Sequence, residues 1–183
     1  FAQRLDDVGY YRTGNANIWT EGDGDAAERV TATWITASMV PLLGVTPLLG
    51  RTFTADEERL GGPHAILLGE AVWRARFGAT ADVIGKTLMV NSVPREIVGV
   101  MPARFSFPTA DTRVWLPARP PIGNLVGDFA YSGVARLVPG ATAEQAQREL
   151  AAVLPRMAES FPRMESGGST AVWLDELGPM PVV

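Results

Sequence analysis

VIGKTLMVNSVPREIVGVMPARFSFP, residues 83–108, is the segment around which the rest of the chain is organised. Two runs rich in β-forming residues, Thr87–Val90 and Arg95–Val100, flank Asn91–Pro94, whose residues favour a turn. This spacing predicts a β-hairpin. The glycines at its edges mark positions where the chain bends or another backbone comes close, and the prolines after it exclude a regular helix. Nothing in the segment is suited to catalysis, so it is a structural signature.

The residues before this segment predict a second hairpin and two short helices. Asn15–Thr20 and Glu28–Thr36 flank a turn of glycines and acids, and the second run alternates apolar and polar residues as a half-buried strand does. Helical turns are expected over 38–43 and from Thr54 to Glu58. A short strand over 65–68 and a helix over 70–77 complete this part.

Strand and helix patterns also follow the central segment. Val114–Leu116 is expected to be a strand, and the prolines and glycines of 117–127 predict a linker or a long surface loop. Beyond it we expect a strand over 132–138, a one-sided helix over 142–161 and a last strand over 170–177.

Composition excludes several classes of protein. The chain has 183 residues, no cysteine, a formal net charge of −4 and a single lysine, Lys86, without any basic run. Disulfides, thiolate chemistry and nucleic-acid binding are therefore not expected. Val30–Gly50 has no charged residue, but its threonines, prolines and glycine argue against a membrane span. If the chain is part of a membrane protein, its spans lie outside these residues.

The sequence contains no complete motif for nucleotide binding, metal binding or nucleophilic catalysis. Gly85-Lys86-Thr87 resembles the end of a phosphate-binding loop, but Thr80 stands where that motif needs glycine. His64 is the only histidine, and no spaced set of carboxylates accompanies it, so we expect no metal site and no cofactor. No nucleophile-elbow pattern is present, and we expect no catalytic residue and no enzyme activity.

The dispersed signature resembles the extracytoplasmic core domain of MacB-like and FtsX-like ABC transporter permeases. The resemblance covers roughly residues 30–154. The residues that we assign to this structural signature are Gly50, Arg51, Phe53, Trp73, Phe77, Gly78, Gly85, Gly99, Val100, Pro102, Phe105, Pro108, Trp115 and Pro117.

The resemblance implies both a function and a location. The domain would be the periplasmic part of a bacterial inner-membrane permease that couples ATP-driven motion of membrane helices to substrate efflux, extraction or signalling. Its partners would be its own transmembrane helices, a second permease half or subunit, the cytoplasmic ABC ATPase and periplasmic proteins. The alternative is a stand-alone, two-lobed peptide- or protein-binding module.

The predicted fold class is α+β, in two lobes. Residues 1–50 and 131–183 are expected to form a discontinuous porter-like lobe, a sheet with helices on one face. Residues 51–130 are expected to form an inserted, β-rich sabre-like lobe with its own aromatic core, so that Gly50 and Tyr131 meet at the junction.

Overall fold

The computed structural model describes residues 4–20, 27–119 and 131–152. The chain divides into two compact units, one of Gly9–Pro120 and one of Phe1–Val8 with Pro121–Val183. Strand β1 (Leu5–Trp19) contributes residues to both units, because the boundary falls within it. The fold is α+β with a mixed sheet, as predicted.

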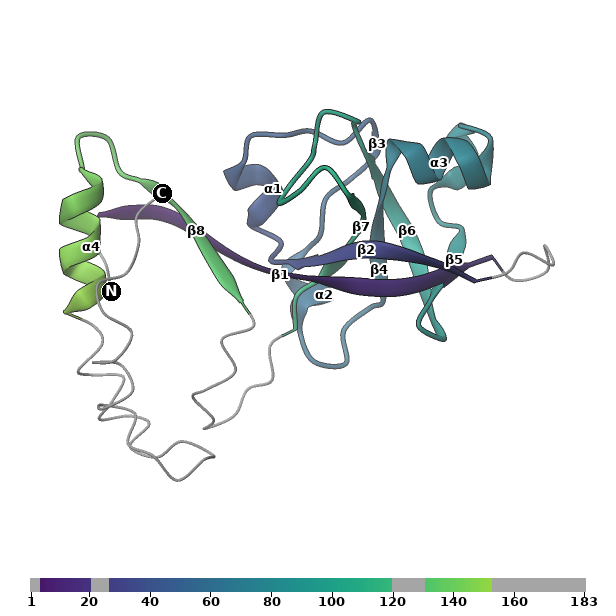
Figure 1. The fold of residues 1–183 in the computed structure, drawn as a ribbon, viewed down its shortest axis with the longest axis horizontal. Coiled ribbons are helices and arrows are strands. Elements are labelled where there is room, and N and C mark those ends of the chain that lie inside the picture. The colour runs from purple at the N-terminus through teal and green to yellow at the C-terminus, as the bar shows by residue number, and fades with distance from the viewer. Residues whose placement is uncertain (1–3, 21–26, 120–130, 153–183) are drawn as a thin grey trace, which may run out of the picture. The chain divides into compact units, whose positions relative to one another are not determined.

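The strands of the Gly9–Pro120 unit pair in a closed ring (Figure 1). Around the ring the order is β1–β2–β7–β4–β6–β5, and β5 returns to β1. The pairs β2–β7 and β4–β6 are parallel, and the others are antiparallel. Closure leaves the ring without an open sheet edge. The strands are β2 (Glu28–Ile35), β4 (Ala65–Gly69), β5 (Thr87–Val90), β6 (Val93–Met101) and β7 (Thr112–Pro117), and the short β3 (Leu49–Gly50) pairs with β6 outside the ring.

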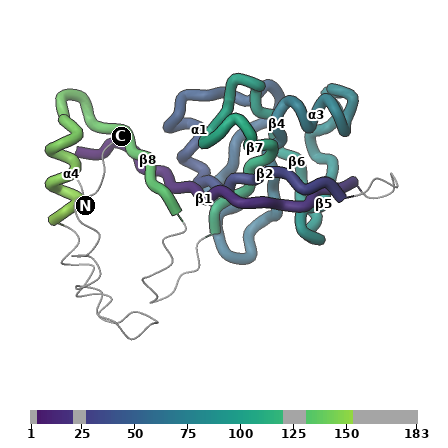
Figure 2. Tube along the Cα trace, viewed as in Figure 1, coloured from purple at the N-terminus to yellow at the C-terminus, as the bar shows by residue number. Residues whose placement is uncertain are grey.

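The parallel pairs unite segments that are distant in sequence. Figure 2 shows the trace of β2 beside that of β7, and Ile35 pairs there with Pro117. Parallel strands need a long crossover connection, and residues 36–111 provide it by way of β4, α3 and the β5–β6 hairpin.

The core lies inside the ring. Its members are inward residues of all the ring strands together with two from the segments after β4: Ala16, Ile18, Val30, Ala32, Ile66, Leu68, Val72, Val83, Leu88, Val90, Ile97, Val100, Val114 and Leu116. On β4, Ala65 and Leu67 are buried as well, although they do not belong to this inner cluster. Burial on both faces explains why β4 is a continuous apolar run without alternation.

Short helices connect the strands. They are α1 (Met39–Leu42), α2 (Ala55–Glu58), α3 (Glu70–Phe77) and the 3-10 turn η1 (Ala81–Val83). The expected helix over 70–77 is confirmed, and Gly78 ends it in the left-handed conformation with φ 60°. Among the described residues no helix is long and apolar enough to cross a membrane.

The central hairpin is confirmed with a tighter turn than expected. Val90 pairs with Val93 and Met89 with Pro94, so the loop contains only Asn91 and Ser92. Both have positive φ, 48° and 66°, which matches the two-residue loop whose backbone fits the twist of a hairpin. Asn91 also fixes the hairpin to β1, because its N–H donates to the Asn17 carbonyl and its side-chain oxygen accepts from the Asn17 N–H.

The unit formed by the chain ends contains β8 (Ser132–Leu137), which neighbours β1, and α4 (Ala143–Ala151). A capping box begins α4: the Thr142 side chain accepts from the Gln145 N–H, and the Gln145 side chain accepts from the Thr142 N–H. The predicted continuation of this helix to 161 and the strand over 170–177 lie outside the described residues.

The predicted boundary between the lobes is wrong. Residues 9–50 belong to the same unit as 51–120, because the hairpin strand β2 pairs with β7 and Leu49–Gly50 pairs with β6. Gly50 therefore lies inside a sheet and not at a junction between lobes. The apolar face of the first hairpin is buried inside the ring that these long-range pairings close, and local sequence patterns do not reveal such pairings.

Candidate functional site

Two signature glycines are paired where β3 lies antiparallel to β6, and we refer to this close approach of the two strands as the β3–β6 crossing. Gly50 pairs with Gly99, and their neighbours Leu49 and Val100 pair beside them. A Cβ on Gly50 would collide with the Val98 carbonyl oxygen, and one on Gly99 would collide with the Arg51 carbonyl oxygen. Gly50 also has a φ of 71°, which L residues with side chains rarely adopt. Only glycine at both positions allows the two backbones to approach so closely.

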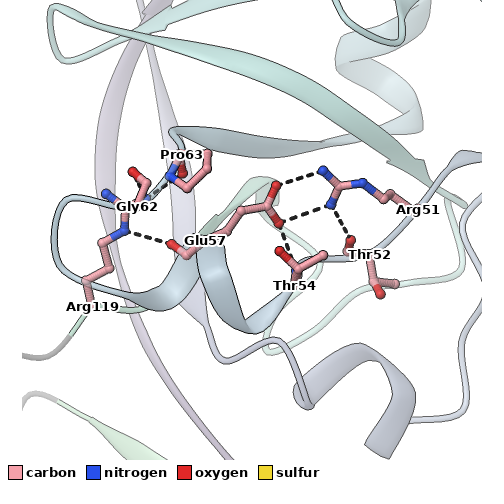
Figure 3. Close-up of polar contacts among 7 residues, drawn as sticks. All are labelled: Arg51, Thr52, Thr54, Glu57, Gly62, Pro63 and Arg119. Carbon is pink, nitrogen blue, oxygen red and sulfur yellow. Dashed lines mark hydrogen bonds and ion pairs between the residues drawn. The ribbon is translucent and has the colours of Figure 1, made fainter.

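Arg51 follows this crossing and forms an ion pair with a buried carboxylate (Figure 3). Its Nη2 lies 2.8 Å from Glu57 Oε1 and its Nη1 3.1 Å from Glu57 Oε2, a two-point contact. Glu57 is 3% exposed, whereas the side chain of Arg51 is 51% exposed. The Thr54 N–H donates to Glu57 Oε2 at 2.8 Å, and Thr54 with Glu57 forms a capping box on α2.

Hydrogen bonding decides the charge state of Glu57. Burial by itself would raise the pKa of this carboxyl group, but the hydrogen bonds from Arg51 and from the Thr54 backbone outweigh burial and lower the pKa. The same hydrogen bond to Glu57 raises the pKa of Arg51. The pair is therefore fully ionised at neutral pH, and it fixes the turn after β3 to α2.

Arg119, just beyond β7, reaches the other end of α2 (Figure 3). Its Nε donates to the Glu57 carbonyl at 2.8 Å, and its Nη2 donates to the carbonyls of Gly62 and Pro63. These are carbonyls at or beyond the end of a helix, where intrahelical donors are lacking. We refer to Arg51, Thr54, Glu57 and Arg119 as the Glu57 clamp, because they connect β3, α2 and β7.

The aromatic signature residues pack on the outer side of β7. Trp115 is buried and pairs with Leu67, and its Nε1 donates to the Phe107 carbonyl at 2.9 Å. The Phe105 ring lies 4.9 Å from that of Trp115 and 6.3 Å from that of Phe107. Phe105 and Phe107 lie close together on the loop between β6 and β7. Pro102 is buried at the start of this loop, and the bond before Pro108 is cis.

The other signature residues are distributed over the same unit. Trp73 and Phe77 are half-buried on α3 against the core, and the Trp73 Nε1 donates to the Thr80 carbonyl. Gly85 has a φ of 85° and an open surrounding. Phe53 and Pro117 are buried, the latter at the end of β7. The structure thus brings together one subset of the signature, at the β3–β6 crossing and the adjoining clamp.

Side chains suited to chemistry are not assembled at this site. Within residues 4–20, 27–119 and 131–152, no group of three or more metal-binding side chains comes together. Lys86 forms an ion pair with Asp82 at 2.8 Å on the surface, immediately before the strand β5 and not at the start of a helix.

Sequence reasoning missed Glu57, Thr54 as its partner, and Arg119. The Thr54–Glu57 spacing, T-x-x-E, is the signal of a capping box and would have found two of them. Arg119 lies next to a proline-rich stretch, and no local pattern connects it to α2.

Comparisons with known proteins agree with this architecture. The family model described as the MacB-like periplasmic core domain matches residues 4–153. The Macrolide export ATP-binding/permease proteins MacB of Shigella dysenteriae and of Escherichia coli K12 are each 26% identical over 128 residues, which is 68% of this chain and 19% of theirs. The chain thus spans about a fifth of the length of these relatives.

Solved structures have the same fold. The periplasmic region of MacB from Actinobacillus actinomycetemcomitans superposes with a TM-score of 0.65 at 13% identity, covering 98% of this chain and 79% of that one. The extracellular domain of the noncanonic ABC-type transporter YknZ from Gram-positive bacteria gives 0.57 at 16% identity, with 98% and 80% covered. Since the family model extends across both units, the chain belongs to the MacB-like periplasmic core domain family of ABC transporter permeases.

Proposed function

We propose that this chain is the non-catalytic, extracytoplasmic domain of an inner-membrane ABC permease, in which it couples ATP-driven motion of membrane helices to export of a substrate. The match of the family model over residues 4–153 is the observation that carries this proposal. A mechanical role also suits the geometry, because a closed ring of strands with a glycine crossing and a buried ion pair resists deformation.

The partners follow from the same proposal. The domain acts together with its own transmembrane helices and a second permease subunit, and a cytoplasmic ATPase moves it indirectly. The relatives are named for macrolide export, so a macrolide is the first substrate to assay. In the full-length gene product, the proposal requires apolar spans of about 20 residues on the sides of this domain.

A spin-label experiment on the full-length permease tests the coupling. The chain has no cysteine, so Ala71→Cys, exposed on α3, introduces a single label on each copy of the domain. We expect the distance between the labels of two copies in a membrane to change on addition of ATP. The control is the double variant Ala71→Cys with Ala110→Cys, mixed with an excess of unlabelled permease so that the measured distance is the one between the two labels of a single copy. Both sites lie in the Gly9–Pro120 unit, so their distance should stay constant.

Two outcomes would contradict the proposed role. ATP-dependent export by a permease in which the distance between copies does not change would refute the coupling role. A change in the control distance would show that the Gly9–Pro120 unit itself deforms, which contradicts a rigid domain.

A further inference from the structure

Three basic side chains gather at one end of the strand ring. His64 directly precedes β4, and its carbonyl accepts from the Glu96 N–H on β6 at 2.8 Å. Arg119 follows β7, and its Nη1 lies 3.4 Å from His64 Nδ1. Arg95 lies on β6 next to Glu96. We refer to His64, Arg95 and Arg119 as the basic cluster, and all three belong to the Gly9–Pro120 unit.

Arg95 is on the inner side of β6. Side chains alternate along a strand, so Arg95 shares a face with Ile97 of the core, while Glu96 is on the opposite face. On that face the charge of Glu96 contributes to raising the pKa of Arg51. No ion pair joins Glu96 to Arg95, both of which the structure describes. The Nε of Arg95 is buried and has no hydrogen-bond partner among the described residues. A buried donor of this kind needs an acceptor.

Arg119 is held in place before any ligand arrives. Its Nε and Nη2 are occupied by the backbone carbonyls of Glu57, Gly62 and Pro63, and these bonds orient its Nη1 toward His64. A guanidinium that is already immobilised loses little conformational entropy on binding an anion.

The positive charge of the cluster is not compensated within the described part of the chain. No carboxylate there forms an ion pair with Arg95 or Arg119. Burial, together with the charge of Arg119, lowers the pKa of Arg95. Burial, followed by the charges of Arg95 and Arg119, lowers the pKa of His64. These shifts agree with a site of positive potential that lacks its counter-ion.

We propose that the basic cluster binds an oxyanion, the carboxylate or phosphate group of a small ligand, between Arg95 and Arg119. The planar fork of a guanidinium matches the spacing of two oxygens on either group. Arg95 provides its unused donors, Arg119 provides Nη1, and His64 borders the site. This proposal is independent of the transport role, because it concerns the surface of one unit only.

The direct test titrates the whole 183-residue chain with sodium phosphate and, separately, with sodium acetate, both against sodium chloride at constant ionic strength. Calorimetry and thermal unfolding are the measurements. We expect saturable binding of at least one probe, with a Kd of about 1 mM or tighter, and a rise in Tm with the concentration of that probe. Binding of phosphate alone or of acetate alone identifies the chemical source of the oxyanion.

A matched pair of variants locates the site. Arg95→Gln should weaken binding at least tenfold, whereas Arg104→Gln, which removes an exposed arginine outside the cluster, should leave it unchanged. Without added anion, Arg95→Gln should unfold at the same or a higher temperature than the parent, because it removes an uncompensated buried charge. Phosphate or acetate should then fail to raise its Tm.

Two results would overturn the proposal. One is the absence of saturable binding of both probes to the parent chain. The other is equal binding by the parent and Arg95→Gln. If Arg95→Gln fails to fold, NMR of the parent decides: the Nε–H signal of Arg95 must shift during the titration, and an unchanged signal during binding refutes the site.

Discussion

Replacing Gly99 by alanine tests whether the β3–β6 crossing holds the Gly9–Pro120 unit together. The new methyl group would collide with the Arg51 carbonyl oxygen and lie 2.9 Å from Leu67 Cδ2. Gly99 pairs with Gly50 on one side and with Leu67 on the other, so β6 cannot shift to relieve the collision.

The collision has two consequences, and together they give the expected loss in the free energy of unfolding. Overpacking a core costs about 1–3 kcal/mol, and the upper end applies because the obstructing atom belongs to the backbone. Separation of the strands would also weaken the bonds from the N–H of Arg51 to the Val98 carbonyl and of Leu48 to the Val100 carbonyl, 2.9 and 2.7 Å long. Each such bond contributes about 1 kcal/mol. We expect Gly99→Ala to lower the free energy of unfolding by about 3–4 kcal/mol.

Gly85→Ala is the matched control. Gly85 has a left-handed φ of 85°, but nothing lies within 4 Å of a Cβ placed there. Only the backbone strain remains, about 1 kcal/mol. Gly50→Ala combines both effects, since it has a φ of 71° and a collision with Val98, so it should cost at least as much as Gly99→Ala.

Urea unfolding followed by circular dichroism and tryptophan fluorescence measures these differences. The expected order of destabilisation is Gly50→Ala, then Gly99→Ala, then Gly85→Ala. A cost for Gly99→Ala equal to or below that for Gly85→Ala would refute the close crossing.

The Glu57 clamp, α3 and Lys86 can each be tested by substitution. Arg51→Ala leaves the buried Glu57 carboxylate with only its Thr54 partner. Because Arg51 is half-exposed, we expect the free energy of unfolding in urea to fall by about 2–3 kcal/mol, less than for a fully buried pair. A fall of less than about 0.5 kcal/mol, the range of an ordinary surface change, would contradict this. The pKa of the Glu57 carboxyl group is lower in the folded chain than its usual value of 4.5. The ionised carboxylate therefore contributes its full stabilisation above pH 4.5, and this contribution disappears as the pH falls through the lower pKa of the folded state. Glu57→Gln should therefore show a smaller loss of stability than the parent between neutral and acidic pH, and parallel curves would contradict it. Trp73→Ala should cost about 2 kcal/mol, less than a fully buried tryptophan, because Trp73 is only half-buried; no change in the urea midpoint would place it outside the core. Finally, calorimetry should detect no saturable ATP binding to the chain, and binding that is lost in Lys86→Ala would refute the assignment of Lys86 as a surface residue.

Local sequence patterns were enough to predict most of the individual elements and the family. Alternation in 28–36, the apolar run over 65–68 and the turn residues at Asn91 and Ser92 depend on interactions within a few residues, so the patterns predicted β2, β4 and the β5–β6 hairpin correctly. The helix over 70–77 with its terminal Gly78 was readable for the same reason.

How these elements pair could not be predicted from local patterns and is seen only in the folded chain. The parallel pair of Ile35 with Pro117 and the antiparallel pair of Gly50 with Gly99 join residues that are far apart in the chain, and many other pairings would bury the same apolar faces. The boundary between the units therefore fell at Val8 and Gly9, and not at Gly50. The Glu57 clamp and the basic cluster have the same origin, because Arg119 acquires its partners only after closure of the ring brings β7 beside β4 and α2.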